Sequence, residues 1–282
     1  MLLITGATGN VGRELARELD TADAAFRVLV RDVDRARTLP ARAERVVGDL
    51  GAPATLRPAF EGVTGLFLLV PGVGLEHTAH ALAAAEAAGV RRIVLLSSFN
   101  AFGDPIPAMG RWHHEREQMI RASGIPFTFL RPGGYMTNAL DWLPTIRQAG
   151  FVLDPTGPGR HAPIDPADIA AVVALALTEN GHDGKAYVLT GSEVFTVAEQ
   201  VAILAEAIGR KLEVRPIATP AEAVRFRYPN GAPPALADAI VEAFTHARAD
   251  TVGLRTDTVE QLLSRKPLTF AHWCARNTDA FR

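Results

Sequence analysis

Hydrophobic positions in the first half of the chain form short continuous runs, and between the runs they recur at helical spacing. The runs predict strands at residues 1–4, 26–30, 45–47, 66–70, 92–96 and 126–130. The intervening segments predict helices at residues 10–21, 33–39, 54–61, 76–89 and 109–124. Continuous runs are typical of strands buried on both faces, so the alternation predicts an α/β fold with a doubly wound parallel sheet of Rossmann type.

The rhythm changes after Arg131. Strand candidates become sparse, at residues 151–153, 161–164, 186–189 and 212–216, and helices dominate. Helix starts are indicated by Asp165-Pro166, by a capping box from Thr196 to Glu199 and by Thr219-Pro220, while residues 228–234 indicate a loop. We therefore expect a Rossmann domain over residues 1–150 and a smaller, mostly helical C-terminal subdomain over residues 151–282, with strands possibly crossing back to the core.

Composition excludes several classes of protein. A net charge of -2 provides no global positive field for nucleic acid. The single cysteine, Cys274, rules out an internal disulfide and a cysteine-cluster zinc site. We see no signal peptide and no apolar stretch long enough to span a bilayer, so we expect a cytoplasmic protein without a membrane partner. Composition leaves a homo-oligomer open.

A glycine-rich turn follows the first predicted strand. Its glycines are Gly6, Gly9 and Gly12, at the spacing GxxGxxG. Gly6 permits a tight exit from the strand, Gly9 lets a diphosphate approach the backbone, and Gly12 lets the helix pack close to the sheet. The helix begins near Asn10, so its N–H groups and the positive end of its dipole would face the phosphates. This context predicts a nicotinamide dinucleotide site.

The end of the second predicted strand bears on the choice of dinucleotide. Arg31 comes directly after the strand and Arg35 follows one helical turn later. Two guanidinium groups favour the 2′-phosphate of NADP(H). Asp32 is the competing residue, because an acidic side chain here would bind the ribose hydroxyl of NAD(H); it could instead cap the next helix. NADP(H) is the prediction and NAD(H) the alternative, and a third interpretation makes Arg31 a solvated surface charge.

Several motifs together resemble the NmrA-like group of atypical short-chain dehydrogenases, and the resemblance covers nearly the whole chain. They are the segments 5–12, 31–32, 48–50, 88–94, 117–133, 164–170, 186–191 and 268–273. Within the group, His113 to Ile120 is similar to the His-x-x-x-Glu helix of bacterial NADPH-dependent quinone oxidoreductases.

The resemblance implies a set of cofactor contacts at the carboxyl ends of the strands. The turn from Gly6 to Val11 would hold the diphosphate, and Arg31 the 2′-phosphate. The remaining contacts would border the adenine, the ribose and the nicotinamide. The full implied set is Gly6, Thr8, Gly9, Asn10, Val11, Arg31, Asp49, Leu50, Leu69, Val70, Pro71, Ser97, Pro132, Gly133, Gly134 and Tyr135.

The usual catalytic Tyr-x-x-x-Lys pair of short-chain dehydrogenases cannot exist here. Tyrosine occurs only at 135, 187 and 228, and residues 139, 191 and 232 are not lysine. His113 is the candidate proton donor, although it could equally pack against the cofactor. Tyr135 could donate a hydrogen bond to a substrate carbonyl or stack beside the nicotinamide. Glu76-His77-x-x-His80 lacks the usual metal-site spacing, so no metal is expected.

These observations predict an NAD(P)-binding domain, a C-terminal substrate-binding part and an NAD(P)H-dependent oxidoreductase. Hydride transfer without a Tyr–Lys pair suits a strong acceptor, so the expected substrate is a quinone-like or other conjugated carbonyl compound. Two alternatives stay open: a regulatory protein that senses NADP(H) without turnover, and a reductase or isomerase that tailors a natural product.

Overall fold

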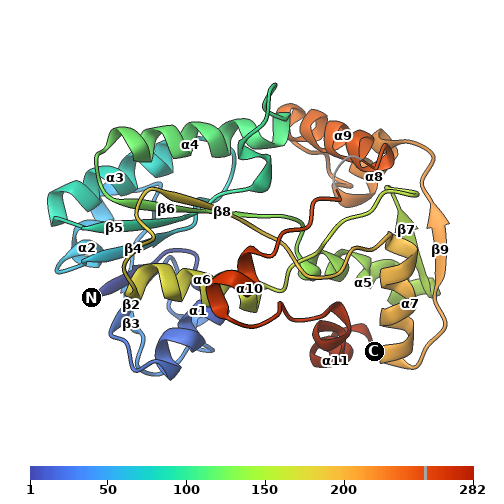
Figure 1. The fold of residues 1–282 in the computed structure, drawn as a ribbon, viewed down its shortest axis with the longest axis horizontal. Helices are drawn as coiled ribbons and strands as arrows, with labels where there is room; N and C mark the ends of the chain where they lie inside the picture. Colours follow the sequence, from blue (N-terminus) through green and yellow to red (C-terminus); the bar gives the residue numbers. More distant parts are fainter. Residues whose placement is uncertain (251–252) are drawn as a thin grey trace. The chain divides into compact units, whose positions relative to one another are not determined.

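A computed structural model describes residues 1–250 and 253–282 of the chain. The described residues form two compact units that interleave along the sequence (Figure 1). Unit 1 contains Met1–Phe102, Gly110–Pro132 and Pro166–Val188, and unit 2 contains Gly103–Met109, Gly133–Asp165 and Leu189–Arg282. Residues 166–188 therefore rejoin the first unit, as the expected crossing of later strands allows. Over the described residues, no helix combines the length and apolar character needed to span a bilayer.

Unit 1 is built on a seven-stranded sheet in the order β3-β2-β1-β4-β5-β6-β8. The ladders that join β3 through to β6 are parallel. The strands are β1 (Leu2–Ile4), β2 (Phe26–Val30), β3 (Glu44–Val47), β4 (Gly65–Leu68), β5 (Arg92–Leu96), β6 (Phe127–Pro132) and β8 (Lys185–Leu189). This is the order of a Rossmann fold, which confirms the predicted fold class. Strand order reverses beside β1, where such folds bind their ligands.

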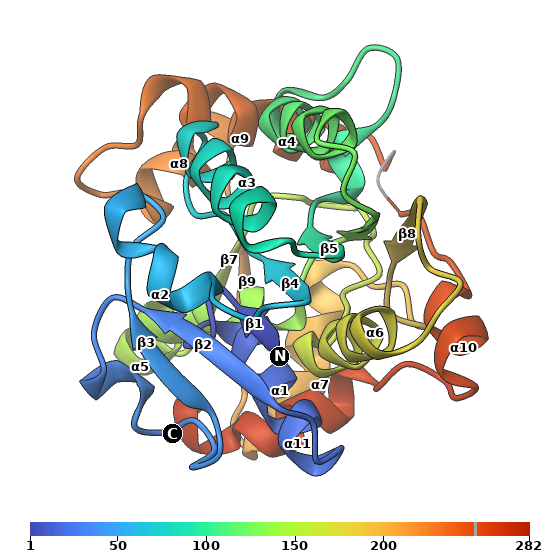
Figure 2. The same cartoon turned by 90° about the vertical axis from the view of Figure 1, so that its left-hand side faces the viewer.

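Helices cover both faces of this sheet, as Figure 2 shows, with α3 and α4 on one side and α1 and α6 on the other. Their bounds are α1 (Asn10–Thr21), α2 (Arg57–Phe60), α3 (Glu76–Ala88), α4 (Arg111–Ala122) and α6 (Pro166–Thr178). Leu66, Phe67 and Leu68 of β4 are completely buried. Burial on both faces explains why the strand sequences are apolar throughout rather than alternating.

Two predicted helices are shorter than the sequence pattern indicates. Residues 33–39 contain only the 3₁₀ turn Asp34–Ala36, and Pro40 follows closely, which disfavours helical backbone before it. Residues 54–61 divide into the 3₁₀ turn Pro53–Thr55 and the short α2, because Pro58 is accommodated only in a first helical turn. The remaining 3₁₀ segments are Phe99–Ala101, Ala108–Gly110 and Met136–Trp142.

Unit 2 is mainly helical around a small sheet in which β7 (Phe151–Asp154) pairs in parallel with β9 (Glu213–Pro216). Its helices are α5 (Leu143–Ala149), α7 (Val197–Ile208), α8 (Pro220–Arg227), α9 (Pro234–Arg248), α10 (Thr258–Leu263) and α11 (Phe270–Phe281). The Trp273 and Phe270 rings of α11 stack 5.6 Å apart in its core. The predicted capping box is confirmed at the start of α7, where Glu199 N donates to Thr196 Oγ1 at 3.2 Å.

The predicted strand at residues 161–164 is wrong. The segment makes only isolated bridges, His161 with Phe195 and Ile164 with Tyr135. Pro163 interrupts it and removes one backbone donor, so a continuous ladder does not form.

Candidate cofactor and active site

The glycine-rich turn lies between β1 and α1, and its three glycines meet different physical demands. Gly6 has φ of +66°, a conformation that side chains disfavour. A Cβ on Gly12 would lie 2.2 Å from the carbonyl oxygen of Gly6, so Gly12 is required for the helix to pack against the turn. Gly9 is different, because a Cβ there would meet only the Gly6 oxygen, at 3.3 Å.

Packing therefore requires glycine less strictly at Gly9 than at Gly12, because a shift of a few tenths of an ångström would accommodate a Cβ. The absent Cβ leaves space beside the start of α1. Gly9 is also the N-cap residue, and it offers no side chain to the first N–H groups of the helix. Such N–H groups, at the positive end of the helix dipole, bind phosphate oxygens well. This backbone fits the diphosphate of a dinucleotide.

Arg13 stabilises the same turn through hydrogen bonds. Its Nε and one terminal guanidinium nitrogen donate to the carbonyl oxygen of Thr8, at 3.2 and 2.8 Å. Sequence analysis did not single out Arg13; its position one turn into the helix is the signal that could have found it.

A cavity of about 280 Å³ opens beside this turn. Arg31, Asp32 and Arg35 line it together with residues of the turn, and all three are exposed. The Asp32 carboxylate accepts a hydrogen bond of 2.9 Å from the backbone N–H of Asp34. This hydrogen bond forms an Asx turn just before the 3₁₀ turn, and the two guanidinium groups form the cationic side of the cavity.

The segments after β3 and β4 complete this cavity with Asp49, Leu50, Leu69 and Pro71. Asp49 accepts a hydrogen bond of 2.8 Å from the backbone N–H of Gly51, which shapes the loop after β3. His77 of α3 also lines the cavity and was missed, because the sequence considered it only for metal binding. His80, its neighbour one turn on, bonds the carbonyl oxygen of Leu50 at 2.7 Å. Among the described residues, no cluster of His, Cys, Asp and Glu is arranged to hold a metal ion.

The loop after β4 is held by Arg116, a buried residue of α4 that is 2% exposed. Its guanidinium donates to the carbonyl oxygens of Val70, Gly72 and Gly74, at 3.4, 2.7 and 2.9 Å. This arginine fixes the backbone that runs past Val70 and Pro71, two of the residues implied to contact the cofactor.

Ser97, at the end of β5, belongs to a buried polar cluster with Glu117 and Arg131. Its hydroxyl donates to Glu117 Oε1 at 2.6 Å, and Arg131 of β6 donates to both carboxylate oxygens, at 2.9 and 2.5 Å. Glu117 lies four residues after His113, so the two side chains belong to neighbouring turns of α4. Because the Ser97 proton is used on Glu117, the hydroxyl is left to accept hydrogen bonds rather than to donate them.

His113 precedes this cluster on α4. Burial, together with the nearby positive charge of Arg116, lowers the pKa of His113 to about 4. Within the residues that the structure describes, its buried Nδ1 has no hydrogen-bond partner. His113 is therefore neutral near pH 7 and holds no transferable proton beyond that of a neutral imidazole.

Pro132 ends β6, and the chain then enters unit 2 through Gly133, Gly134 and Tyr135. Gly133 N donates to the carbonyl oxygen of Leu189 at 2.9 Å, and Gly134 O accepts from Ile164 N at 2.9 Å. Burial raises the pKa of Tyr135 above its usual value, so its hydroxyl is a weaker acid than a free phenol.

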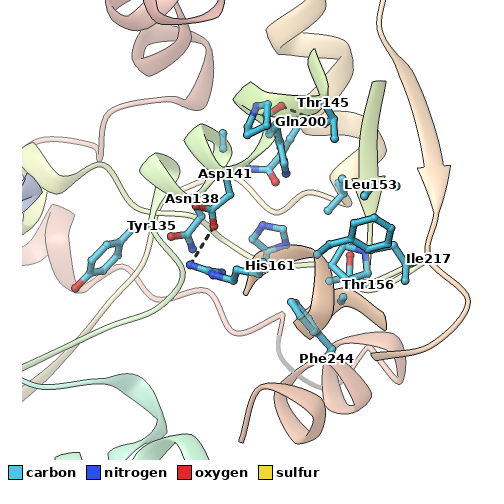
Figure 3. Close-up of a pocket in the computed structure, with 18 residues that line it drawn as sticks. Tyr135, Asn138, Asp141, Thr145, Leu153, Thr156, His161, Gln200, Ile217 and Phe244 are labelled. Atoms are coloured by element: carbon cyan, nitrogen blue, oxygen red, sulfur yellow. Dashed lines mark hydrogen bonds and ion pairs between the residues drawn. The ribbon is translucent and has the colours of Figure 1, made fainter. Parts of the chain in front are cut away.

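A second cavity of about 280 Å³ lies within unit 2, and Figure 3 shows residues that line it. Most of the wall is apolar, with polar groups from Asn138, Thr145, Thr156, His161 and Gln200. An ion pair of 3.0 Å joins Arg227 to Asp141 at this cavity. Sequence analysis assigned substrate binding to the C-terminal part as a whole and did not identify His161.

Residues 6–180, more than half of the chain, match the family model described as NAD(P)H-binding. The chain belongs to the NAD(P)H-binding family.

Members of this family are similar to the chain along its whole length. An NAD(P)H azoreductase of Xenophilus azovorans is 37% identical, over 100% of this chain and 99% of the relative. The (4-alkanoyl-5-oxo-2,5-dihydrofuran-3-yl)methyl phosphate reductase of Streptomyces griseus subsp. griseus is 38% identical over the same shares. The NADPH-dependent quinone oxidoreductase QOR2 of Escherichia coli, in a crystal structure with NADPH, has a TM-score of 0.83 at 29% identity, over 98% of this chain and 99% of that one.

For this member of the NAD(P)H-binding family, the comparisons confirm an NAD(P)H-dependent oxidoreductase. They also confirm the Rossmann fold and the predicted nicotinamide cofactor, and NADPH in the E. coli structure supports the phosphorylated form. The individual site residues stay predictions.

Proposed function

We propose that this protein uses NADPH to reduce a quinone-like or other conjugated carbonyl compound by hydride transfer, without a Tyr–Lys pair. When bound, the cofactor supplies the hydride. The backbone of the turn from Gly6 to Val11 binds its diphosphate, and Arg31, with Arg35 beside it, binds the 2′-phosphate. The loops after β3 and β4, with Asp49 to Leu50 and Leu69 to Pro71, border the adenosine. Ser97 and the segment from Pro132 to Tyr135 border the nicotinamide.

The observation that carries this proposal is that neither candidate proton donor has a readily transferable proton near pH 7. His113 has a pKa of about 4, so it is already deprotonated near pH 7, and burial raises the pKa of Tyr135. Neither group can readily protonate an acceptor as hydride arrives. An acceptor that takes hydride without acid assistance fits such a site, and a quinone is one, because the charge spreads over its conjugated ring and oxygens.

The overall reaction then balances with water as the source of the proton. A quinone accepts one hydride from the nicotinamide and one proton from solvent, which gives the hydroquinone and NADP⁺. The chain contributes by holding the nicotinamide and the acceptor in the orientation that hydride transfer needs. The buried cluster of Glu117, Ser97 and Arg131 fixes the strand ends that do this. Two relatives are named for azo and quinone reduction, and both acceptors are electron-poor conjugated systems.

The test mixes purified protein with NADPH and a panel of quinones, an azo dye and saturated ketones, and follows the near-ultraviolet absorbance of NADPH. We expect turnover with the quinones or the azo dye and none with the saturated ketones, which need acid assistance. NADP⁺ and NADPH binding without turnover on any acceptor would contradict the enzyme and favour the cofactor sensor.

A further inference from the structure

The cavity within unit 2 has an apolar wall suited to a flat ring. Trp142, Leu153, Ile217, Phe226 and Phe244 contribute side chains to it. Its volume of about 280 Å³ is close to the lower limit for small-molecule sites, so it suits a ligand of one or two fused rings. The wall thus determines the shape and apolar character of the ligand, and the charges around the cavity decide whether that ligand can be an ion.

Two residues of opposite charge line the cavity, and they neutralise each other. Arg227, the last residue of α8, forms an ion pair of 3.0 Å with Asp141 of the 3₁₀ segment, and a dashed line marks the pair in Figure 3. The two side chains are 46% and 50% exposed. While this pair is formed, the charge of the guanidinium is balanced by Asp141 and is not free to attract a ligand anion.

The other polar side chains of the wall carry no charge. Four of them are amides or hydroxyls, on Asn138, Thr145, Thr156 and Gln200. Burial lowers the pKa of His161 from its ordinary value of 6.5, against the smaller raising effects of Gln200 and Asp154, so its imidazole is neutral near pH 7. Among the described residues that line the cavity, none therefore offers an anion an unbalanced positive charge.

Two further charged residues lie directly behind the wall, and they also have opposite signs. Asp154 is 6% exposed and accepts hydrogen bonds from the backbone N–H and the hydroxyl of Thr156, at 2.8 and 2.9 Å. Arg248 of α9 donates to the carbonyl oxygens of Pro155 and Ile217, at 2.8 and 2.5 Å. Both charged groups thus bond to residues of the wall, where their charges offset each other rather than favour an anion.

We propose that this cavity binds an uncharged aromatic ring, and that the Arg227–Asp141 ion pair makes it reject the anionic counterpart of such a ring. Moving a carboxylate or sulfonate from water to an apolar wall costs hydration free energy, which only a free positive charge would offset. The proposal rests on the proposed function only in making this ring the acceptor, since quinones are uncharged flat rings of this kind.

The test compares two probes of nearly the same shape that differ in charge, 2-naphthamide and 2-naphthoate. Their dissociation constants are measured by calorimetry at about pH 7.5, where the carboxyl group is ionised. We expect 2-naphthamide to bind about tenfold more tightly, because only the carboxylate loses strong hydration on entering the cavity. Equal affinity of the two probes, or tighter binding of 2-naphthoate, would overturn the proposal in the wild-type protein, with no variant required.

Asp141→Asn tests the role of the ion pair. It leaves Arg227 without its countercharge, so we expect the preference for 2-naphthamide to fall about twofold to fivefold, the usual strength of a half-exposed ion pair, and to recover in added salt. Asp279→Asn is the matched control, because it removes the partner of Arg282 from a pair of the same 3.0 Å separation outside the cavity wall. The control should leave the ratio of the two dissociation constants unchanged.

A second variant covers the case in which Asp141→Asn does not fold, as judged by circular dichroism. Arg227→Gln leaves Asp141 as the only charge of the pair, so it should raise the preference for 2-naphthamide instead. An unaltered ratio in a folded variant of either kind would overturn the proposal.

Phe226→Ala locates the binding in this cavity. Phe226 is 58% exposed, so its truncation should leave the fold intact, and it lines the cavity. We expect the loss of apolar contact to weaken both probes by about threefold or more, with their ratio unchanged. Unchanged dissociation constants would place the probes elsewhere and overturn the site.

NADPH oxidation with 1,4-naphthoquinone, measured in the same preparations, separates this proposal from the proposed function. We expect 2-naphthamide to compete with the quinone and to raise its KM without changing kcat. Inhibition that lowers kcat instead would contradict the link between the cavity and the acceptor. Discrimination between the probes without any turnover would leave the binding site and contradict the reaction, whereas turnover without discrimination would leave the reaction and contradict the site.

Discussion

At the scale of single residues, the titratable groups near the strand ends are poorly suited to donate a proton, because His113 is neutral near pH 7 and Glu117 is already hydrogen-bonded. Arg116 is buried among backbone carbonyls, and its charge helps to keep His113 neutral. Both oxygens of the Glu117 carboxylate accept hydrogen bonds from Arg131, and one also accepts from Ser97. Through Glu117 and Arg116, α4 is thus bonded to the ends of β5 and β6 and to the loop after β4.

His113 makes a testable contribution to stability in acid. Its folded pKa of about 4 lies below the ordinary value of 6.5, so the unfolded chain binds a proton first as the pH falls. Stability from this residue is complete above pH 6.5 and is lost between pH 6.5 and 4. We expect His113→Gln to reduce the acid-induced loss of unfolding free energy by roughly 1–3 kcal/mol, measured by urea denaturation. An identical loss in the variant would contradict the shifted pKa.

Arg31 should discriminate between the two dinucleotides. Replacing it with alanine removes a guanidinium from the cavity proposed to bind the 2′-phosphate, so we expect the Kd for NADPH to rise about tenfold or more, with little change for NADH. Arg37→Ala is the matched control, because Arg37 is equally exposed on the same turn but pairs with Asp34 at 2.7 Å. An equal loss of affinity for NADPH and NADH, or an equal loss of NADPH affinity in both variants, would indicate that Arg31 is only a solvated surface charge.

At the scale of elements, two glycines in the turn from β1 into α1 serve different purposes: Gly12 is needed for packing, and Gly9 is proposed to be needed for binding. Gly12→Ala would force a methyl group to within 2.2 Å of a backbone oxygen, whereas Gly9→Ala meets its nearest atom at 3.3 Å, in extended backbone that alanine adopts easily. We expect Gly12→Ala to lower the melting temperature strongly and Gly9→Ala to lower it much less, because only a shift of a few tenths of an ångström is needed there. Gly9→Ala should nevertheless weaken NADPH binding at least tenfold, because its methyl group fills the space for the diphosphate. Unaltered binding by a folded Gly9→Ala protein would place the diphosphate elsewhere.

The junction of β5, β6 and α4 depends on a single buried carboxylate. Glu117 is 1% exposed and joins Ser97 and Arg131 from neighbouring strands. Glu117→Gln leaves Arg131 without its countercharge, and we expect a loss of about 3 kcal/mol in unfolding free energy. Glu115→Gln alters an exposed carboxylate on the same helix and should change stability by less than about 0.5 kcal/mol. Similar losses of unfolding free energy in the two variants would show that the Glu117 cluster contributes little to stability.

At the scale of the whole molecule, the order of segments along the chain differs from their grouping in space. The segment 166–188 supplies α6 and β8 to unit 1, although it follows a long stretch of unit 2. Its strand was predicted at residues 186–189, but its place beside β6 was not, since a short apolar run carries no information about its neighbour. The last strand of the sheet therefore comes after two segments of unit 2, Gly103–Met109 and Gly133–Asp165, in the sequence.

The sequence by itself determined what depends on near neighbours. Apolar runs gave the strands, the glycine spacing predicted the turn, Arg31 and Asp32 stood next to a strand end, and the positions of three tyrosines and three lysines excluded a Tyr–Lys pair. Only tertiary structure decided which distant groups meet. Ser97, Glu117 and Arg131 are separated by up to 34 positions, yet they meet in one hydrogen-bonded cluster. The reason is physical: periodicity and turn chemistry act over a few residues, whereas the protonation of a buried side chain depends on whatever partner the packing brings to it.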